Sequence, residues 1–397
     1  ICRNVGKHAG GVLIAPHRIT DFSAIYCDDE GHRVSQFDKD DVEAVGLVKF
    51  DFLGLRNLTV IDAAVRNINL RRAKEGKDAL VLEDLPLDDA KAYKLLQDAK
   101  TTAVFQLESM GMKKYLAKLQ PTNIEDVIAM CALYRPGPLD AGMVEMYIDR
   151  KHGREEVIYD HPNLEPILEI TNGVIVYQEQ VMQIAQVYAG FTLGKADLLR
   201  RAMSKKNAQE MQAMEADFLI GAEKNGHEKS KTKDIFAMMA KFAGYGFNRS
   251  HAYAYSALAF QMAFFKTHYP DVFFEVMLNY SNVGYIHDAL QFEFQIAPLY
   301  INTIPYHDKF EKDKIYMGLK TIKGLSKDFA IWIIENRPFI TFEDFILRLP
   351  HQYRKKEQLL PLIQLGLFDE IESNRKKIIE NLFQKQLYFL RHLQKAA

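Results

Sequence analysis

Cysteine is scarce in this sequence: Cys2, Cys27 and Cys131 are the only three, and they are widely spaced. An odd number without C-x-x-C spacing argues against a disulfide scaffold and against a zinc knuckle, so we expect a chain from a reducing, cytoplasmic compartment. Long apolar runs are also missing. The longest, residues 252–265, is shorter than a membrane span and is interrupted by Ser256, so we expect no membrane partner.

An excess of charge of either sign is lacking as well. The 51 Lys and Arg residues nearly balance the 52 Asp and Glu residues, which leaves a formal net charge of -1. This balance excludes a wholly basic coat protein, but a local basic patch still permits nucleic-acid binding. With 397 residues, 48% hydrophobic and 26% charged, the chain has the composition of a globular protein of two or three domains. Because it starts at Ile1 inside an apparent domain, we expect a fragment of something longer.

Several common enzyme motifs are also absent. Residues 190–195 (GFTLGK) have one residue too few between the glycines for a P-loop, and Ala196 replaces the Ser or Thr that would hold magnesium. Residues 244–246 (GYG) begin like a dinucleotide fingerprint, but Arg249 stands where the third glycine belongs. The sequence has no HExxH and no GxSxG. These absences argue against P-loop, dinucleotide-binding, zinc-protease and serine-hydrolase chemistry.

The chain changes character along its length. Residues 1–56 read as rich in strands, with strands expected at residues 12–14 and 47–53. From about Leu58 the helical period dominates. Residues 122–125 (TNIE) resemble the capped start of a helix, and residues 135–138 (RPGP) predict a break. Further helices are expected at residues 179–188, 195–205, 231–242 and 252–268, short strands within 301–320, small helices within 317–369 and one long helix over 370–397.

The first candidate site lies in the second predicted strand. Alternate side chains of a strand point to the same side, so Lys49 and Asp51 share one face. The opposite face is apolar and consists of Val48, Phe50 and Phe52. A carboxylate on a rigid strand suits a hard cation, and an ammonium beside it suits a phosphate. The pair therefore indicates phosphoryl transfer, and the alternative is an ion pair with no further role.

The second candidate is the basic segment 198–206 (LLRRAMSKK). Arg201 and Lys205 lie one helical turn apart, Arg200 points to a neighbouring direction, and Lys206 follows. Arginine binds phosphate through two parallel hydrogen bonds, so this cluster can grip a triphosphate or a nucleic-acid backbone. The alternative is a solvated basic helix face.

The third candidate is the segment 244–255 (GYGFNRSHAYAY). Its glycines allow a tight turn, and Asn248 or Ser250 can cap the following helix, whose first amides favour an anion. Arg249 and His251 add donors at the same place, and the tyrosines can stack on bases. The alternative is a capped helix with tyrosines in the core.

The fourth candidate is the segment 319–326 (LKTIKGLS). A short helix, a turn at Lys323 and Gly324 and a second helix can present backbone amides to DNA phosphates without reading sequence. The alternative is an ordinary turn between two helices. Ser326 stands where such hairpins often have a second glycine, which weakens the phosphate-binding interpretation.

Several separate segments carry motifs that point to the same family. They are 6–11 (GKHAGG), 35–39 (SQFDK), 48–55 (VKFDFLGL), 102–109 (TAVFQLES), 134–139 (YRPGPL), 177–182 (YQEQVM), 199–203 (LRRAM) and 242–251 (FAGYGFNRSH). Together they resemble the alpha subunit of bacterial DNA polymerase III, the C-family of replicative DNA polymerases. The resemblance extends over residues 5–280 and, less closely, over residues 316–369.

The resemblance implies an α+β fold that is mostly α. Its implied domains are the second half of a polymerase-beta-like palm (1–56), a helical fingers domain (57–280), a connecting segment (281–315), a tandem helix-hairpin-helix region (316–369) and a helical tail (370–397). By resemblance, Asp51 matches the third catalytic aspartate, which helps to hold two Mg²⁺ ions. Lys49 matches a residue near the incoming triphosphate, which Arg200 and Arg201 embrace. The resemblance also implies that three residues of the third candidate lie near the nucleotide: Asn248, Arg249 and His251.

The implied activity is template-directed addition of dNTPs to a primer 3′ end during chromosomal replication, with primer–template DNA and dNTPs as partners. The family's other two catalytic aspartates lie in an upstream segment that this sequence does not contain. Asp38, Asp40 and Asp41 do not match it and are expected in a loop. We therefore expect this chain alone not to polymerise. A non-catalytic nucleic-acid-binding module and a damage-tolerant member of the same family stay open as alternatives.

The resemblance also implies contacts with a sliding clamp and other replisome subunits. Residues 384–389 (QKQLYF) fit the pattern Q-x-x-L-x-F of clamp-binding peptides. The alternative is plain helical sequence. By the same resemblance, we expect this chain to bind DNA through four residues: Lys205, Lys206, Lys323 and Gly324.

Overall fold

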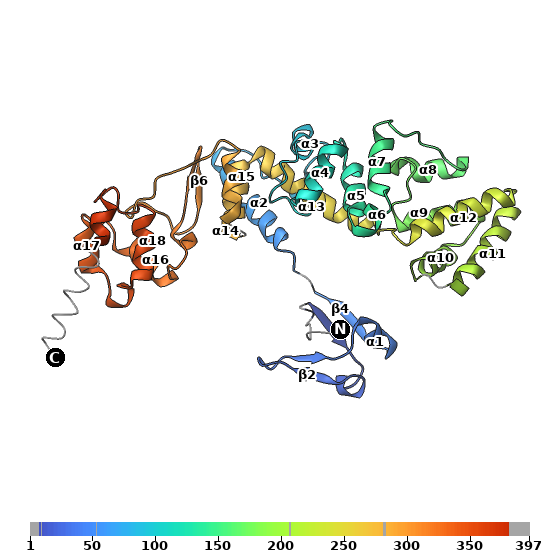
Figure 1. The fold of residues 1–397 in the computed structure, drawn as a ribbon, viewed down its shortest axis with the longest axis horizontal. Coiled ribbons are helices and arrows are strands. Elements are labelled where there is room, and N and C mark those ends of the chain that lie inside the picture. The colour runs from blue at the N-terminus through green and yellow to red at the C-terminus, as the bar shows by residue number, and fades with distance from the viewer. Residues whose placement is uncertain (1–7, 9, 53, 206–207, 281–282, 381–397) are drawn as a thin grey trace. The chain divides into compact units, whose positions relative to one another are not determined.

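The computed structural model describes residues 8, 10–52, 54–205, 208–280 and 283–380 (Figure 1). The chain divides into two compact units, Ile1–Thr59 and Val60–Ala397, which we call the strand unit and the helical unit. Helices dominate the second unit and the strands are short, so the predicted α+β, mostly α fold class is confirmed.

The strand unit is built from two short antiparallel ribbons. Strand β1 (Gly11–Ile14) pairs with β4 (Val48–Asp51), and strand β2 (Ile25–Cys27) pairs with β3 (Arg33–Ser35). In the first ribbon Gly11 lies opposite Asp51. The strands predicted at residues 12–14 and 47–53 are therefore present, the second in a shorter form.

The stretch expected to be a loop around three aspartates is instead the start of a helix. Helix α1 covers Lys39–Ala44, and the Asp38 side chain caps it by accepting hydrogen bonds from the amides of Asp40 and Asp41, both at 2.9 Å. Carboxylates in a first turn also interact favourably with the positive end of the helix dipole. The loop prediction was wrong because these three acids satisfy a helix end.

One face of the β1–β4 ribbon is apolar and exposed. Val12, Ile14, Val48 and Phe50 have 49%, 55%, 53% and 47% of their surface accessible, and they alternate with the residues of the opposite face. The predicted apolar face of the second strand therefore exists, but it is not covered by the described part of the strand unit. The other face carries the polar candidate residues.

The helices α2 to α14 follow β4, and they range from four residues in α8 to twenty in α13. Their bounds are α2 (Arg56–Lys74), α3 (Ala90–Gln97), α4 (Met110–Leu119), α5 (Ile124–Leu133), α6 (Pro136–Asp140), α7 (Met143–Lys151), α8 (Glu165–Leu168), α9 (Gln178–Ala189), α10 (Leu193–Lys205), α11 (Ala208–Lys224), α12 (Lys229–Ala243), α13 (Arg249–His268) and α14 (Pro270–Tyr280). Asn123 caps α5 by accepting from the Asp126 amide at 3.1 Å, within the capped helix start expected at residues 122–125.

The rest of the helical unit alternates short elements. They are α15 (Ile286–Leu290), β5 (Gln295–Ile296), β6 (Lys309–Glu311), β7 (Lys314–Tyr316), the 3-10 turn η6 (Leu319–Thr321), α16 (Lys327–Asn336), α17 (Phe342–Arg348) and α18 (Lys356–Gln364). The three strands form a small sheet in the order β5-β7-β6. The short strands predicted within 301–320 and the small helices predicted within 317–369 are thus found.

Three buried apolar clusters hold the helical unit together. The first surrounds α13, which packs on α3, α5 and α14. The second lies among α9, α10, α11 and α12 and includes the fully buried Tyr188 and Phe218. The third is built around Phe329 and Phe345. Helix α13 is therefore the central helix of the first cluster. Its first turn carries residues of the third candidate site.

The break predicted at residues 135–138 is confirmed, whereas the prediction of one helical tail needs correction. Helix α5 ends at Leu133, and Pro136 starts the separate helix α6. Proline fits the first position of a helix because its missing amide hydrogen has no partner there. The tail is not one helix from residue 370: residues 370–374 are not helical and the helix begins at residue 375. The clamp-like segment 384–389 lies outside the described residues.

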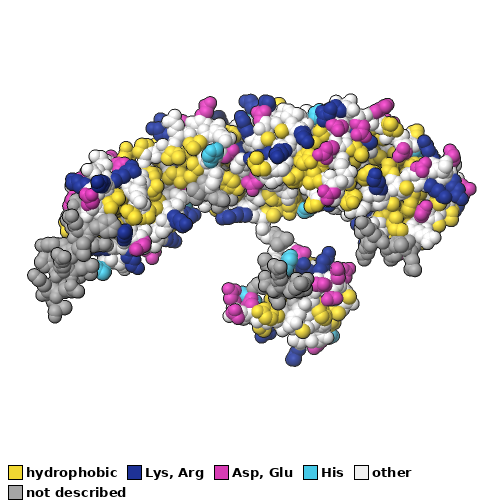
Figure 2. Space-filling model, viewed as in Figure 1, with side chains coloured by type: hydrophobic (Ala, Val, Ile, Leu, Met, Phe, Trp, Pro, Cys, Tyr) yellow, Lys and Arg dark blue, Asp and Glu magenta, His cyan; other side chains and the backbone are white. Residues whose placement is uncertain are grey.

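The visible surface of the helical unit mixes both signs of charge. Figure 2 shows Lys and Arg side chains interspersed with Asp and Glu side chains and with apolar patches, in keeping with a net charge of -1. In the part of the chain that the structure describes, no helix is both long enough and apolar enough to span a membrane.

Candidate functional site

In the strand unit, Lys49 and Asp51 lie on the same face of β4, as the strand period predicts. The Lys49 Nζ atom is 3.0 Å from the Asp51 Oδ1 atom, and 25% and 49% of the two side chains are exposed. The His8 Nδ1 atom lies 3.9 Å from the same carboxylate oxygen. An exposed carboxylate with one engaged oxygen leaves the other oxygen able to bind a further ligand.

Gly11 makes this convergence possible. It faces Asp51 across the ribbon, and a Cβ atom at this position would come within 2.7 Å of Lys49 Cε, 3.0 Å of His8 Nδ1 and 3.3 Å of Asp51 Oδ1. The three side chains therefore occupy the space that any larger residue would need. Sequence reasoning used residues 6–11 only as part of a resemblance and did not predict this packing role.

A hollow of about 1160 Å³ lies beside Lys49 within the strand unit. Its charged lining is mainly basic: Arg18, Arg33 and Lys39 accompany Lys49, and Asp38 is the acidic residue among the lining residues. A concave surface lined by several cations concentrates anions such as phosphates. The arginines and Lys39 were missed because they are dispersed along the sequence and meet only in the folded ribbon pair.

Among the described residues, one cluster has the right atoms and spacing for a metal ion: Asp28, Glu30 and His32, at the turn between β2 and β3. The Asp28 carboxylate already accepts hydrogen bonds from the amides of Glu30 and His32, at 3.1 and 2.8 Å. These contacts explain the acidic residue as a turn former. The cluster therefore needs no ion to account for it.

In the helical unit, the segment 244–248 is held between two distant parts of the chain. On one side, Arg135 donates to the Tyr245 carbonyl at 2.6 Å, and its guanidinium lies 4.6 Å from the centre of the Phe247 ring. The Tyr245 ring also fills the space where a Cβ of Gly137 would stand, with ring carbons 2.8 Å away. Residues 134–137 (YRPG) thus pack directly against residues 244–247 (GYGF) and fix their position.

On the other side, the start of α9 fixes the same segment. The Gln178 amide donates to the Phe247 carbonyl at 2.9 Å, and its side-chain amide donates to the Gly246 carbonyl at 3.2 Å. Gln178 then accepts a hydrogen bond from Arg200 Nη1 at 3.1 Å. One glutamine therefore links the second and third candidate sites, which lie far apart in the sequence.

The two arginines of α10 share one carboxylate. Arg200 Nη2 lies 2.7 Å and Arg201 Nε lies 2.9 Å from the oxygens of Asp197. The hydrogen bond from Arg200 holds the pKa of Asp197 below its usual range. Arg201 is 63% exposed, so its guanidinium can reach a ligand with only a small loss of contact. Lys205 is the last residue of α10, and Lys206 lies outside the described residues.

Asn248 and Arg249 are anchored by carboxylates from other helices. The Asn248 side chain caps α13 by accepting from the His251 amide at 2.8 Å, and it donates to Glu179 at 2.9 Å. The Arg249 amide donates to both Glu179 oxygens at 3.1 Å, and its guanidinium pairs with Glu125 at 2.9 Å. Asn248, predicted as a possible cap, is therefore the cap that the fold uses.

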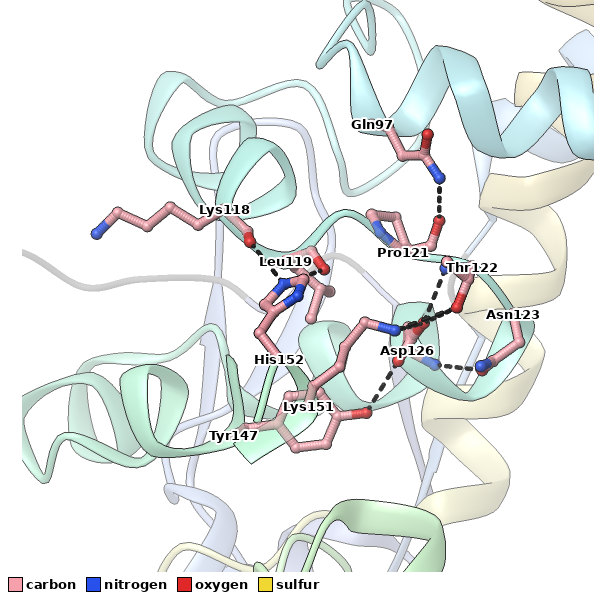
Figure 3. A network of polar contacts seen from close by, with 10 residues as sticks. All are labelled: Gln97, Lys118, Leu119, Pro121, Thr122, Asn123, Asp126, Tyr147, Lys151 and His152. Carbon is pink, nitrogen blue, oxygen red and sulfur yellow. Dashed lines mark hydrogen bonds and ion pairs between the residues drawn. The ribbon is translucent and has the colours of Figure 1, made fainter. Parts of the chain in front are cut away.

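A polar network fixes the end of α5 that carries Glu125 (Figure 3). Its neighbour Asp126 is buried and accepts hydrogen bonds from Lys151 at 2.7 Å, from the Thr122 amide at 2.8 Å and from the Tyr147 hydroxyl at 3.3 Å. His152 lies 3.1 Å from the last carbonyls of α4. Because α4, α5 and α7 are joined here, the carboxylate that holds Arg249 has a rigid base.

His251 is exposed in the first turn of α13. Its ring centre lies 4.1 Å from that of Tyr255 and 5.5 Å from that of Phe247. The structure thus brings Arg200, Asn248, Arg249 and His251 together around one segment. Sequence reasoning did not assign the residues that complete the network, which are Gln178, Glu179, Glu125, Arg135 and Asp197. Three of these five lie in segments that carry the family resemblance, and that was the available signal.

The helix-hairpin-helix candidate has two unlike turns. In the first, Lys323 and Gly324 are exposed between η6 and α16, and Gly324 has a φ of +91° that suits glycine. In the second, Gly366 also has a positive φ, but Arg375 pairs with Asp369 and stands where a Cβ of Gly366 would be. The first turn is therefore open to a ligand, whereas the second is covered by a side chain of the protein.

Comparisons with known proteins match these regions in order. Residues 1–54 match the family model described as bacterial DNA polymerase III alpha NTPase domain, residues 57–226 match the finger domain of the same subunit, and residues 293–378 match a helix-hairpin-helix motif.

Curated relatives agree with the family models. The chain is 50% identical over 380 residues to DNA polymerase III subunit alpha from Streptococcus pyogenes serotype M18, covering 96% of this chain and 36% of that protein. It is 47% identical over 399 residues to the subunit of the same name from Escherichia coli K12, covering 96% of this chain and 34% of that protein. The chain thus spans about a third of the length of these relatives, and it belongs to the bacterial DNA polymerase III alpha subunit family.

Proposed function

We propose that this chain is part of a DNA-directed DNA polymerase that extends a primer by adding dNTPs during chromosomal replication. The observation that carries the proposal is the half-exposed Asp51 carboxylate, paired with Lys49 at 3.0 Å beside a basic hollow in the strand unit. A carboxylate can contribute to a metal site, and an ammonium and an anion-binding surface can offset the charge of a triphosphate in nucleotidyl transfer.

Asp51 fits the part of a magnesium ligand, because one of its oxygens is engaged by Lys49 and its side chain is 49% exposed on a fixed strand. Bound by Asp51 and further carboxylates, two magnesium ions would activate the primer 3′ hydroxyl and neutralise charge on the leaving pyrophosphate. Lys49 would donate to the triphosphate and would hold the Asp51 carboxylate in one orientation. One carboxylate is too few for two ions, so the activity belongs to the full-length parent protein.

The helical unit would supply the nucleotide-facing groups. Arg200 and Arg201 would bind phosphate oxygens, with Asp197 keeping both guanidinium groups oriented. His251 is exposed beside Tyr255 and would contact the nucleotide, while Asn248 caps the helix below it. Arg249 pairs with Glu125, which supports a role in holding the segment in place near the nucleotide.

We further propose the domain division implied by the resemblance: palm to residue 56, fingers to 280, a connecting segment to 315, helix-hairpin-helix units to 369, then a tail. The open turn at Lys323 and Gly324 would bind DNA backbone phosphates, as would Lys205 and Lys206. A sliding clamp and other replisome subunits would bind the full-length protein, with residues 384–389 as a candidate clamp contact.

The test is primer extension by the full-length parent polymerase carrying Asp51→Asn. Asparagine keeps the shape of the side chain but removes the charge that a magnesium ion requires. We expect extension to fall by several orders of magnitude, while the affinity for primer–template DNA stays within about threefold, because DNA binding rests mainly on phosphate contacts made elsewhere.

A matched control is Asp62→Asn, which alters an aspartate of α2 that is 62% exposed and pairs with Arg66 within the same helix. This variant is expected to extend primers at the wild-type rate. Full extension by Asp51→Asn would contradict the assignment of Asp51 as a metal ligand and would leave its pair with Lys49 a structural one.

A further inference from the structure

Residues 99–109 form a loop with an unusual backbone. Ala99, Ala103 and Gln106 have φ values of +54°, +62° and +62°, in the left-handed region that side chains other than glycine seldom adopt. Local hydrogen bonds accompany each of them: the Lys100 amide bonds back to Leu95 at the end of α3, and two turns are closed by bonds from Val104 to Thr101 and from Leu107 to Val104. Backbones of this kind persist where the surrounding structure fixes them, and they concentrate at ligand-binding sites.

The loop is fixed by a lysine without solvent exposure. Lys266 of α13 is 0% exposed, and its Nζ atom donates to the carbonyls of Lys100 and Thr102 at 2.7 and 2.8 Å. The same atom lies 2.6 Å from Asp288. A second anchor is Glu108, which accepts from the Ala103 amide at 3.1 Å. One buried ammonium thus fixes this loop to α13 through two of its contacts and pairs with Asp288 of α15 through the third.

Between these anchors the loop presents a half-buried aromatic ring. Val104 and Leu107 are fully buried, whereas Phe105 is half-buried and Gln106 is exposed. The Phe105 ring centre lies 5.2 Å from that of Tyr255, which in turn lies 4.1 Å from that of His251. Phe105, Tyr255, His251 and Phe247 therefore form a continuous row of rings, which we call the ring row.

The ends of the ring row differ. At Phe247 the guanidinium of Arg135 covers the ring at 4.6 Å, so that end is closed by a protein cation. At Phe105 the next residue is an exposed glutamine with hydrogen-bonding atoms. A ring beside an adaptable amide is the combination that contacts a nucleobase through its flat face and its edge.

We propose that the loop 99–109 is a further nucleobase-contacting part of the site, with Phe105 as the stacking residue and Lys266 as a positioning residue. This inference rests on the proposed function, because the ring row contains His251, which is proposed to contact the nucleotide. The base belongs either to the incoming dNTP or to the DNA. The chemistry of the contact is the same in both cases.

The test uses the full-length parent polymerase with Phe105→Leu, which keeps apolar bulk but removes the ring. We expect either the KM for dNTP or the Kd for primer–template DNA to rise by about 5- to 100-fold, the range that loss of one base–aromatic contact covers. A rise in the KM alone assigns the base to the nucleotide, and a rise in the Kd assigns it to DNA. Phe105→Tyr, which restores a ring, should return both constants to within about threefold of wild type.

The control is Phe264→Leu, since Phe264 is also a half-buried phenylalanine packed on the same apolar cluster but lies outside the ring row. It should leave both constants unchanged. If Phe105→Leu proves unstable, Phe105→Met provides the ring-free variant. Constants within twofold of wild type for a folded ring-free variant overturn the inference. That failure is distinct from failure of the proposed function, which is judged by Asp51→Asn in the same assays.

Discussion

The strand unit and the helical unit each contain a lysine–aspartate ion pair. The two pairs have the same charged groups but differ in their exposure to solvent. Lys49 and Asp51 are 3.0 Å apart and are 25% and 49% exposed. Lys266 and Asp288 are 2.6 Å apart and are 0% and 8% exposed. Water competes with the first pair and is excluded from the second. The exposed pair can therefore exchange its partners for a ligand, while the enclosed pair can only hold the fold.

The contrast extends to the surroundings of each pair. Lys49 lines a basic hollow and lies beside an apolar sheet face that is half exposed. Lys266 lies under three phenylalanine rings, at 5.9, 5.5 and 5.1 Å from those of Phe273, Phe274 and Phe292. The lysine of the proposed catalytic pair is thus accessible to solvent, whereas the lysine that holds the loop 99–109 is enclosed by apolar side chains.

The largest expected effect on stability comes from breaking the enclosed pair. Lys266→Met should lower the free energy of unfolding by about 3–5 kcal/mol, because Asp288 is left buried without a counter-charge. The measurement is urea unfolding of the chain followed by circular dichroism. Adding Asp288→Leu to this variant should restore part of the loss, because a buried pair replaced by apolar residues no longer leaves a lone charge. A double variant no more stable than the single one would show that the loss comes from elsewhere.

The pH dependence of stability should carry the signature of the same lysine. Burial lowers the pKa of Lys266 to about 8 from 10.5, so between these values the unfolded chain binds more protons than the folded one. The free energy of unfolding should therefore rise as the pH increases from about 8 to 10.5, by at most about 3 kcal/mol, and should not change below 8 through this group. The charged neighbours are Asp288, Lys113 and Glu108.

The check is urea unfolding at several pH values between 7 and 10.5, for wild type and for the double variant at Lys266 and Asp288. Subtracting the two curves removes the titration of surface lysines and tyrosines, which both proteins share. A difference that is flat with pH would contradict the lowered pKa.

The same contrast explains how far sequence reasoning reaches. The shared face of Lys49 and Asp51 follows from the period of a strand, and the capping roles of Asn123 and Asn248 follow from local hydrogen-bonding rules. Each of these depends on residues within four positions of one another. Local rules also failed at Asp38, where the acidic stretch predicted as a loop is a helix start, and at residues 370–374, which are not helical.

Contacts between distant segments were out of reach. Lys266 and Asp288 are 22 residues apart, and Asn248 and Glu179 are 69 apart. Neither spacing corresponds to a helix or strand period, so only packing brings these pairs together. One signal was available: Lys266 directly follows the apolar run 252–265, and a lysine at the end of such a run indicates a buried charge that requires a partner. It could not have indicated which partner.

The smallest expected change in stability comes from altering the exposed pair. A loss of activity without a loss of stability would distinguish this pair most clearly from the enclosed one. Lys49→Met should change the free energy of unfolding by less than about 1 kcal/mol, the usual contribution of an ion pair in contact with water. Primer extension by the full-length parent should nevertheless fall by about tenfold or more, because a phosphate loses a charge-assisted contact.

Lys309→Met is the matched control for that variant, since Lys309 also pairs with a carboxylate two residues along a strand, Glu311, with both side chains 56% exposed. It should change neither stability nor extension. Equal extension by the two variants would mean that exposure of a pair does not by itself mark function. A loss confined to Lys49→Met, with both proteins equally stable, would instead separate an accessible pair in a basic hollow from an accessible pair on an ordinary strand.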